Sequence, residues 1–222
     1  WINDKQFATD DFALSAGVLT AGPKLTESVT VTVQHAAVFD APLLRSLITV
    51  QNPGPSSATL NRVDWVFAEI GGDQNATRAS SSGDQTFTVA DRWTVSSDSD
   101  DVTPPGVPVV LYVLYGAGSP SETTTSVANR VYRVGTISPL NQWGMRATFE
   151  TISVPPGATR RLLFFTGLYA SNDAAVAAAQ LFAQTTGCAF VGLSAAERAE
   201  IVNWQFAPAN PTCGLFLPSL SK

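Results

Sequence analysis

The sequence predicts an all-β protein: an antiparallel two-sheet β-sandwich of about nine strands with two short C-terminal accessory helices. Three observations support this fold class. Apolar and polar residues alternate along most of the chain between Ser28 and Tyr169, Gly- and Pro-containing turns separate the alternating runs, and the spacing of apolar residues becomes helical near Ser171. Two packed sheets fit this pattern because one open sheet would leave an apolar face in water.

Each predicted strand is bounded by a turn signal. The run Val29, Val31 and Val33 alternates with polar residues, and Asn52-Pro53-Gly54-Pro55 ends the second strand because proline lacks an amide hydrogen. Residues 109–115 are almost wholly apolar, which indicates a strand with both faces covered. We expect strands at residues 28–35, 43–51, 60–70, 85–89, 92–96, 109–115, 126–134, 143–154 and 160–169.

Two helices are expected near residues 172–184 and 194–204. Asn172 and Asp173 precede an Ala-rich run and supply an N-cap, while Ser194 and Glu197 have the spacing of a capping box. Both helices are too short to be stable alone, so we expect them to pack on the sandwich.

Residues 1–27 are predicted to be an extended N-terminal arm, and residues 28–222 a single β-sandwich domain with a disulfide-clipped tail. Gly and Pro interrupt the apolar residues of the arm. The arm could lie along a sheet edge of its own domain or add to the edge of a neighbouring copy. Its candidate assembly residues are Phe12, Leu14, Val18 and Leu19.

Composition excludes two classes of partner. The chain has 222 residues, 45% of them hydrophobic and 14% charged, with a formal net charge of -5. A negative surface with scattered basic residues repels phosphate backbones, so we expect no nucleic acid. No apolar run reaches the roughly 18 residues of a membrane span, so we expect a chain that is not membrane-embedded.

The two cysteines indicate an oxidising compartment. Cys188 and Cys213 have no nearby histidine or second cysteine pair with zinc spacing, which favours a disulfide. Closing that loop would stabilise the fold by roughly 3 kcal/mol. With Trp1 in place of an initiator Met, this predicts a secreted protein, extracellular or at the cell surface, from which a signal peptide was removed; an excised fragment is the alternative.

The only cofactor candidate is calcium. Asp98, Asp100 and Asp101 place several carboxylate oxygens in one loop, but the glycine and distal glutamate of an EF-hand are absent. A solvated loop is the favoured interpretation. Further aspartates could join the loop if the hairpins align, namely Asp73, Asp84 and Asp91.

Catalytic candidates are sparse. His35 is the only histidine, with Asp40 and Ser46 as its nearest triad companions in sequence, and a structural role is favoured for it. Glu69 and Glu150 could form a glycosidase pair, but both lie in strand patterns where a solvated face explains them. We therefore expect no enzyme.

Aromatic residues suggest a possible sugar platform. Trp65, Trp93, Trp143 and Tyr112 could stack on sugars as in carbohydrate-binding modules, although core packing explains most of them. Asn75-Ala76-Thr77 fits the N-glycosylation pattern at Asn75.

Five segments occur in a recognisable order along the chain. They are residues 80–93, Val154-Pro155-Pro156-Gly157, Ser171-Asn172-Asp173-Ala174, residues 192–197 and Ile201-Val202-Asn203-Trp204. With these segments, roughly residues 45–206 resemble secreted bacterial cell-surface β-sandwich modules of poorly defined function. The resemblance implies an exported β-sandwich and implies no catalytic residues.

These observations predict an extracellular structural protein. The favoured function is the repeating subunit of a surface filament or pilus-like fibre assembled by β-strand exchange between copies of itself, or an adhesive surface module. The alternative is a carbohydrate-binding or accessory domain of a larger secreted enzyme, with surface glycans as partners.

Overall fold

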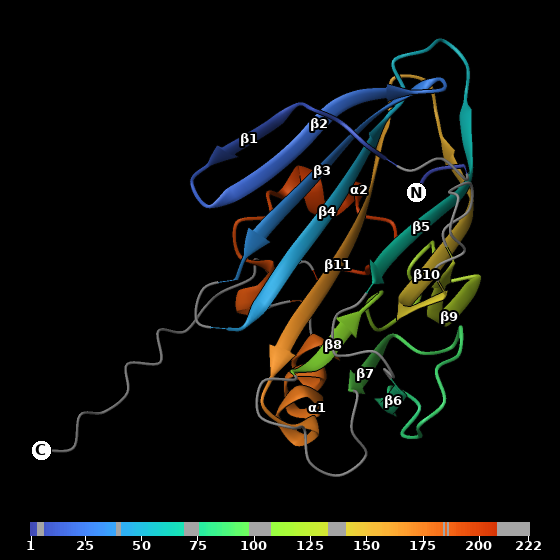
Figure 1. Cartoon of the computed structure of the whole chain (residues 1–222). Coiled ribbons are helices and arrows are strands. Elements are labelled where there is room, and N and C mark those ends of the chain that lie inside the picture. The colour runs from blue at the N-terminus through green and yellow to red at the C-terminus, as the bar shows by residue number, and fades with distance from the viewer. Residues whose placement is uncertain are drawn as a thin grey trace, which may run out of the picture.

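The computed structural model describes residues 1–3, 7–38, 41–68, 76–97, 108–132, 141–183, 185 and 187–207, and these contain eleven strands in two antiparallel sheets. The larger sheet has the order β1-β2-β3-β4-β11-β8-β7-β6 and the smaller one β5-β10-β9 (Figure 1). The strands are β1 (Phe12–Ser15), β2 (Val18–Thr26), β3 (Val29–Ala37), β4 (Leu43–Gln51), β5 (Ala58–Ala68), β6 (Ala76–Ser80), β7 (Trp93–Ser97), β8 (Val109–Val113), β9 (Ser126–Tyr132), β10 (Asn141–Val154) and β11 (Thr159–Tyr169). The predicted antiparallel β-sandwich with two short C-terminal helices is confirmed.

The middle of the larger sheet is buried on both faces. Alternate residues of β8 belong to two different cores: Tyr112 packs between the two sheets against Trp65 and Phe67, whereas Leu111 belongs to the core under the helices, together with Phe165. This three-layer arrangement explains why residues 109–115 are apolar almost throughout, since neither face of the strand meets water.

Two helices and two short 3₁₀ segments cover the second face. They are α1 (Asn172–Gln180), η1 (Leu181–Ala183), η2 (Cys188–Phe190) and α2 (Ala195–Glu200). The predicted capping box is confirmed, because Ser194 Oγ accepts from the Glu197 amide and the Glu197 carboxylate accepts from the Ser194 amide. At α1 the cap is Ser171, one residue before the predicted pair, and its hydroxyl accepts from the Ala174 amide.

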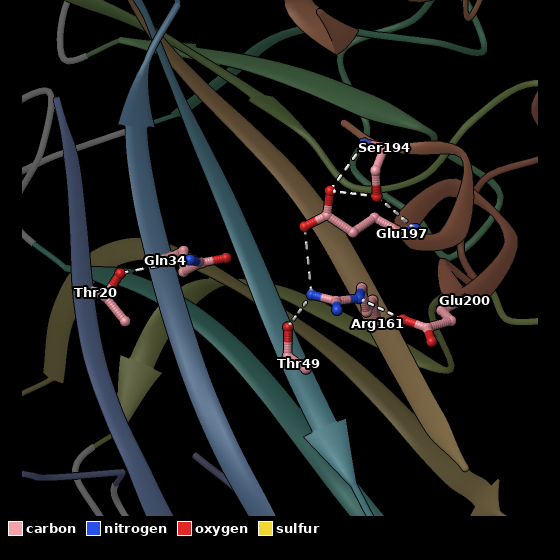
Figure 2. A network of polar contacts seen from close by, with 7 residues as sticks. All are labelled: Thr20, Gln34, Thr49, Arg161, Ser194, Glu197 and Glu200. Atoms are coloured by element: carbon pink, nitrogen blue, oxygen red, sulfur yellow. Dashed lines mark hydrogen bonds and ion pairs between the residues drawn. The ribbon is translucent and has the colours of Figure 1, made fainter. Parts of the chain in front are cut away.

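An arginine fastens α2 to the sheet. Arg161 on β11 donates to Thr49 Oγ1 on β4 at 2.6 Å and to Glu200 Oε2 at 2.8 Å, and it lies 3.7 Å from Glu197 Oε1 (Figure 2). Glu197 therefore serves both the capping box and the sheet contact. This explains how a six-residue helix, too short to persist alone, keeps its position.

Asn203 lies at the junction of the sheet and the C-terminal segment. It is fully buried, and its side-chain amide accepts from Leu163 N at 2.9 Å and donates to Leu163 O and Leu114 O, both at 2.8 Å. The β8–β11 ladder ends at the pair Phe165–Val113. The asparagine amide thus replaces the ladder where the two strands separate.

One predicted strand was wrong, and strand β6 was not predicted. Residues 85–89 form a loop and not a strand, and the neighbour of β7 is instead β6, which the sequence analysis did not predict. Hydrogen bonds from the loop backbone to the carboxylates of Asp84 and Asp91 replace strand pairing there.

The N-terminal segment, predicted to be an extended arm, contains strands β1 and β2. Strands β1 and β2 form a hairpin through Ala16 and Gly17, whose φ angles of 49° and 76° suit a two-residue turn. Strand β2 pairs along β3, so the hairpin extends the larger sheet of its own chain. Phe12, Leu14 and Leu19 remain exposed on it.

Among the described residues, no helix has the length and apolar character needed to cross a membrane.

Replacing Asn203 should unfold the junction. Asn203→Ala removes three hydrogen bonds and leaves buried backbone groups without partners, so we expect the free energy of unfolding to fall by about 3 kcal/mol or more. Urea denaturation measures the change. The matched control is Asn61→Ala on an exposed position of β5, where a change within about 0.5 kcal/mol is expected; equal losses in both variants would contradict the role of Asn203.

Candidate functional site

A groove opens between the β6–β7 hairpin, the loop that joins these strands and helix α1. Its volume is ≈ 510 Å³. It combines one large aromatic ring with several side chains able to form hydrogen bonds, which is the composition expected of a small-ligand site. These side chains are Arg78, Asp84, Gln85, Arg92, Trp93 and Gln180.

Asp91 fixes the loop that forms one wall of the groove. Its carboxylate is fully buried and accepts from Ser82 N at 3.0 Å, Thr88 N at 2.8 Å, Thr88 Oγ1 at 2.9 Å and Ser81 Oγ at 3.2 Å. Burial opposes ionisation of Asp91, but the hydrogen bonds outweigh it and hold its pKa below the ordinary value. A single ionised group therefore ties both ends of the loop together.

Asp84 stabilises the tip of the same loop. Its Oδ1 accepts from Thr86 N and Ser80 Oγ, each at 2.9 Å, and from Ser82 Oγ at 3.1 Å. The Thr86 amide is the main cause of its lowered pKa, followed by the Ser80 hydroxyl. Because both aspartates are engaged by the loop itself, they shape the groove and do not form a metal site with each other.

Trp93 provides the aromatic surface. It lies at the start of β7, and its side chain is half-buried between the sheet and the helical layer. Within the described part of the chain its ring contacts no other aromatic ring, unlike Trp65, which stacks on Phe164 at 4.3 Å in the core. A tryptophan that lines a groove and lacks an aromatic partner leaves part of its ring available to a ligand.

The remaining polar groups border Trp93. Arg78 is oriented by Ser97, donating from Nε to Oγ at 3.1 Å and from Nη2 to the carbonyl oxygen at 3.2 Å. The side chain of Arg92 makes no hydrogen bond or ion pair with the described residues. Gln180 is the last residue of α1 and is exposed, as is Gln85 on the facing loop. Guanidinium and amide groups thus stand on two sides of the ring.

Trp65 and Tyr112, two other members of the predicted aromatic platform, do not line this groove. Trp65 and Tyr112 are buried in the inter-sheet core, at 6% and 0% exposure, and the side chain of Trp143 is outside the described set. Among the described side chains of the predicted sugar platform, Trp93 lines this groove.

Several predicted site residues lie outside the described residues. They include the calcium candidates Asp98, Asp100 and Asp101, the proposed extra ligand Asp73, and also Asp40, Glu69, Asn75 and Cys213. The Cys188–Cys213 disulfide and the calcium loop stay predictions. Among the residues that are described, no cluster of three His, Cys, Asp or Glu could hold a metal ion.

His35 and Ser46 are neighbours on paired strands. His35 Nδ1 lies 2.9 Å from Ser46 Oγ, and burial lowers the pKa of His35, so the imidazole is neutral at pH 7. Ser46 is 1% exposed, so its hydroxyl cannot reach a substrate. The pair forms a cross-strand hydrogen bond, in line with the favoured structural interpretation. Glu150 is an exposed residue of β10 opposite Arg62.

A second, more apolar hollow lies under the turn of the β1–β2 hairpin. It has a volume of ≈ 480 Å³ and contains Arg45, whose Nη1 donates to the carbonyl oxygens of Val191 at 2.7 Å and Ala189 at 3.3 Å. These bonds hold the η2 region against β4. The guanidinium of Arg45 in this hollow is therefore occupied by the protein's own backbone.

No protein family and no curated protein matches this chain. Solved structures with a related arrangement include a galactose mutarotase-like protein from Lactobacillus casei (TM-score 0.44, 11% identity, 72% of this chain and 72% of that one). A polysaccharide lyase is similar over 74% of this chain (TM-score 0.45, 9% identity), and a TPR-domain containing protein from Parabacteroides distasonis over 69% (TM-score 0.40, 11% identity). This chain spans 23% of the lyase and 32% of the TPR-domain protein. With TM-scores below 0.5, the assignment of the site rests on the geometry of this chain alone.

Sequence reasoning missed most of the groove. Arg78, Arg92 and Gln180 were not singled out, because residues of β6 and α1 lie about a hundred positions apart and nothing local indicates that they meet. The available signal was the segment 80–93 itself, where serines and threonines surround two aspartates. That composition is typical of a loop held by side-chain hydrogen bonds.

The loop should loosen in acid. The lowered pKa values of Asp84 and Asp91 mean that their stabilising effect is complete above the ordinary value of 3.8 and is lost as the pH falls through the lower folded values. We expect Asp91→Asn to lower the free energy of unfolding by about 2–3 kcal/mol at pH 7, because an amide NH₂ would face the loop donors. Thermal unfolding between pH 7 and pH 2 tests this; a variant that loses as much stability in acid as the parent would contradict it.

Proposed function

We propose that this protein is a carbohydrate-binding module and that the groove beside Trp93 binds a glycan. The observation that carries the proposal is the half-buried Trp93 ring, which lines the groove without an aromatic partner among the described residues and is bordered by Arg78, Arg92 and Gln180. This was the alternative function in the sequence analysis.

The chemistry of sugars fits such a surface. One face of a pyranose ring carries C–H groups, which pack on an indole, while its hydroxyls point outward in the ring plane and need donors and acceptors. Arg92 and Gln180 supply N–H donors, and the amide of Gln180 also supplies an acceptor. The side chains around Trp93 match both requirements.

We propose binding and not catalysis. Glycoside hydrolysis uses two carboxyl groups across the scissile bond, one to donate a proton and one to attack or to activate water. Asp84, which lines the groove, and Asp91, which holds its loop, are engaged by loop amides and hydroxyls and are held ionised. Neither is available as a general acid.

An extracellular location and a role on a cell surface or in a larger secreted enzyme remain part of this proposal. A rigid loop needs no reorganisation when a ligand enters, so most of the interaction energy is available for affinity. A surface module gains avidity when several copies are presented together.

Binding should depend on the groove side chains. A glycan array selects the sugar, and isothermal titration calorimetry then compares variants. We expect Gln180→Ala and Arg92→Met each to weaken binding about tenfold, the equivalent of one lost hydrogen bond, and Trp93→Ala to abolish it. The matched controls are Gln51→Ala, an exposed glutamine of β4, and Arg160→Met on β11, neither of which lines the groove.

Two outcomes would contradict the proposal. One is that the unmodified protein binds no glycan on the array. The other is binding that survives all three groove variants, which would place the site elsewhere. Thermal unfolding of each variant separates loss of contact from loss of fold, since Gln180 is exposed and its replacement leaves the core unchanged.

A further inference from the structure

The outer edge of β1 offers unpaired backbone groups. In the sheet order β1 is terminal, and within the described chain its one neighbour is β2. Hydrogen-bonded and non-hydrogen-bonded pairs alternate along an antiparallel ladder, beginning with a bonded pair next to a two-residue turn. Ser15 and Ala13 therefore bond inward to β2, and Asp11 does so too, because its carbonyl oxygen accepts from Gly22 N at 2.9 Å. The N–H and C=O groups of Phe12 and Leu14 point outward.

The same two residues carry exposed apolar side chains. Phe12 is 62% exposed and Leu14 75%, and Leu19, directly opposite Leu14, is 40% exposed. They share the face of the sheet that bears His35 and Val33 on β3. In Figure 1 the β1–β2 hairpin extends away from β5, β10 and β9, so the smaller sheet does not cover this part of the face.

We propose that β1 pairs with β1 of a second copy of this chain about a two-fold axis at Ala13. In this register Phe12 of each copy lies opposite Leu14 of the other, and each of these pairs exchanges two backbone hydrogen bonds. Phe12 and Leu14 of both copies then form one apolar cluster on one face. The two larger sheets become continuous.

Charge favours the antiparallel arrangement. Asp10 and Asp11 precede β1, and in the two-fold register Asp11 lies opposite Ser15 of the other copy. Asp11 of one copy is then four positions along the strand from Asp11 of the other copy, which is a separation of roughly 13 Å. A parallel pairing would place them side by side, where like charges repel.

The opposite edge of the sheet is a poorer partner. On β6, Thr77 is 8% exposed and its Oγ1 accepts from Asn129 Nδ2 of β9 at 3.0 Å, so this edge is partly covered by the smaller sheet. Pairing of β1 with itself is therefore favoured over head-to-tail pairing with β6. A two-fold contact closes a dimer and does not propagate a fibre. It therefore differs from the filament predicted from the sequence, in which residues 1–27 would have to leave their own sheet.

Crosslinking tests the register. In the proposed pairing Ala13 faces Ala13 across the axis in a non-hydrogen-bonded pair, where Cα atoms lie about 4.5 Å apart and a disulfide can form. Ala13→Cys should yield a covalent dimer on a non-reducing gel. Ser15→Cys, equally exposed but roughly 13 Å from its counterpart, should not.

Sedimentation measures the association without a crosslink. The contact is small, so we expect a weak dimer with Kd on the order of 10–100 µM and twice the chain mass of 23.4 kDa. Leu14→Pro removes an outward N–H that the β1–β2 ladder does not use and should raise Kd at least tenfold. Leu25→Lys, at a leucine that is 67% exposed on β2 and lies outside the proposed contact, should leave Kd unchanged.

Three results would overturn the proposal. They are a monomer at protein concentrations near 1 mM, polymers that grow beyond the dimer, or equal crosslinking of the two cysteine variants. Loss of the dimer does not bear on glycan binding, because β1 and the groove strands β6 and β7 lie at opposite ends of the sheet.

Discussion

The fold depends on a central pair of strands, β8 and β11, that are buried on both faces and joined at their diverging ends by the side chain of Asn203. One face supports the smaller sheet and the other supports the helices. Without the Asn203 amide, the backbone of Leu163 and Leu114 would lie in a dry interior with unmet hydrogen-bonding groups. A bonded asparagine in this place also fixes Trp204, whose Nε1 donates to Leu163 O at 2.8 Å and whose ring packs on Phe165 and Phe190.

The apolar cores hold the three layers together. Polar contacts between segments that are distant in sequence fix the positions of these layers relative to one another. Apolar packing is tolerant of small shifts, whereas hydrogen bonds and ion pairs have restricted geometry. Arg161 sets the place of α2 over β4 and β11, and Arg45 sets that of the η2 region. Gly116 allows a close approach of the two segments, since a Cβ there would lie 2.7 Å from the Trp204 ring. A few hydrogen bonds and ion pairs at the edge of the helical layer therefore fix its position on the sheet.

Strands with strong alternation or continuous apolar character were predictable from the sequence, and so were the helix starts. Val29, Val31 and Val33 signal β3 by themselves, and Ser194 with Glu197 signals α2. Strands β1, β2 and β6 were missed because their apolar residues are few or interrupted by Gly22 and Pro23. Trp93 was identified as a candidate by residue type, while the arginines and Gln180 beside it were invisible until β6, β7 and α1 were brought together.

The groove draws its walls from two parts of the chain that separate when the protein unfolds. Residues 78–93 lie on the sheet side and residues 176–180 on the helix. A molecule held between them would bind the native state and not the unfolded chain. It would therefore raise the melting temperature, and the increase would grow with the concentration of the ligand. The midpoint of melting could therefore be used to screen unlabelled compounds for a ligand before its identity is known.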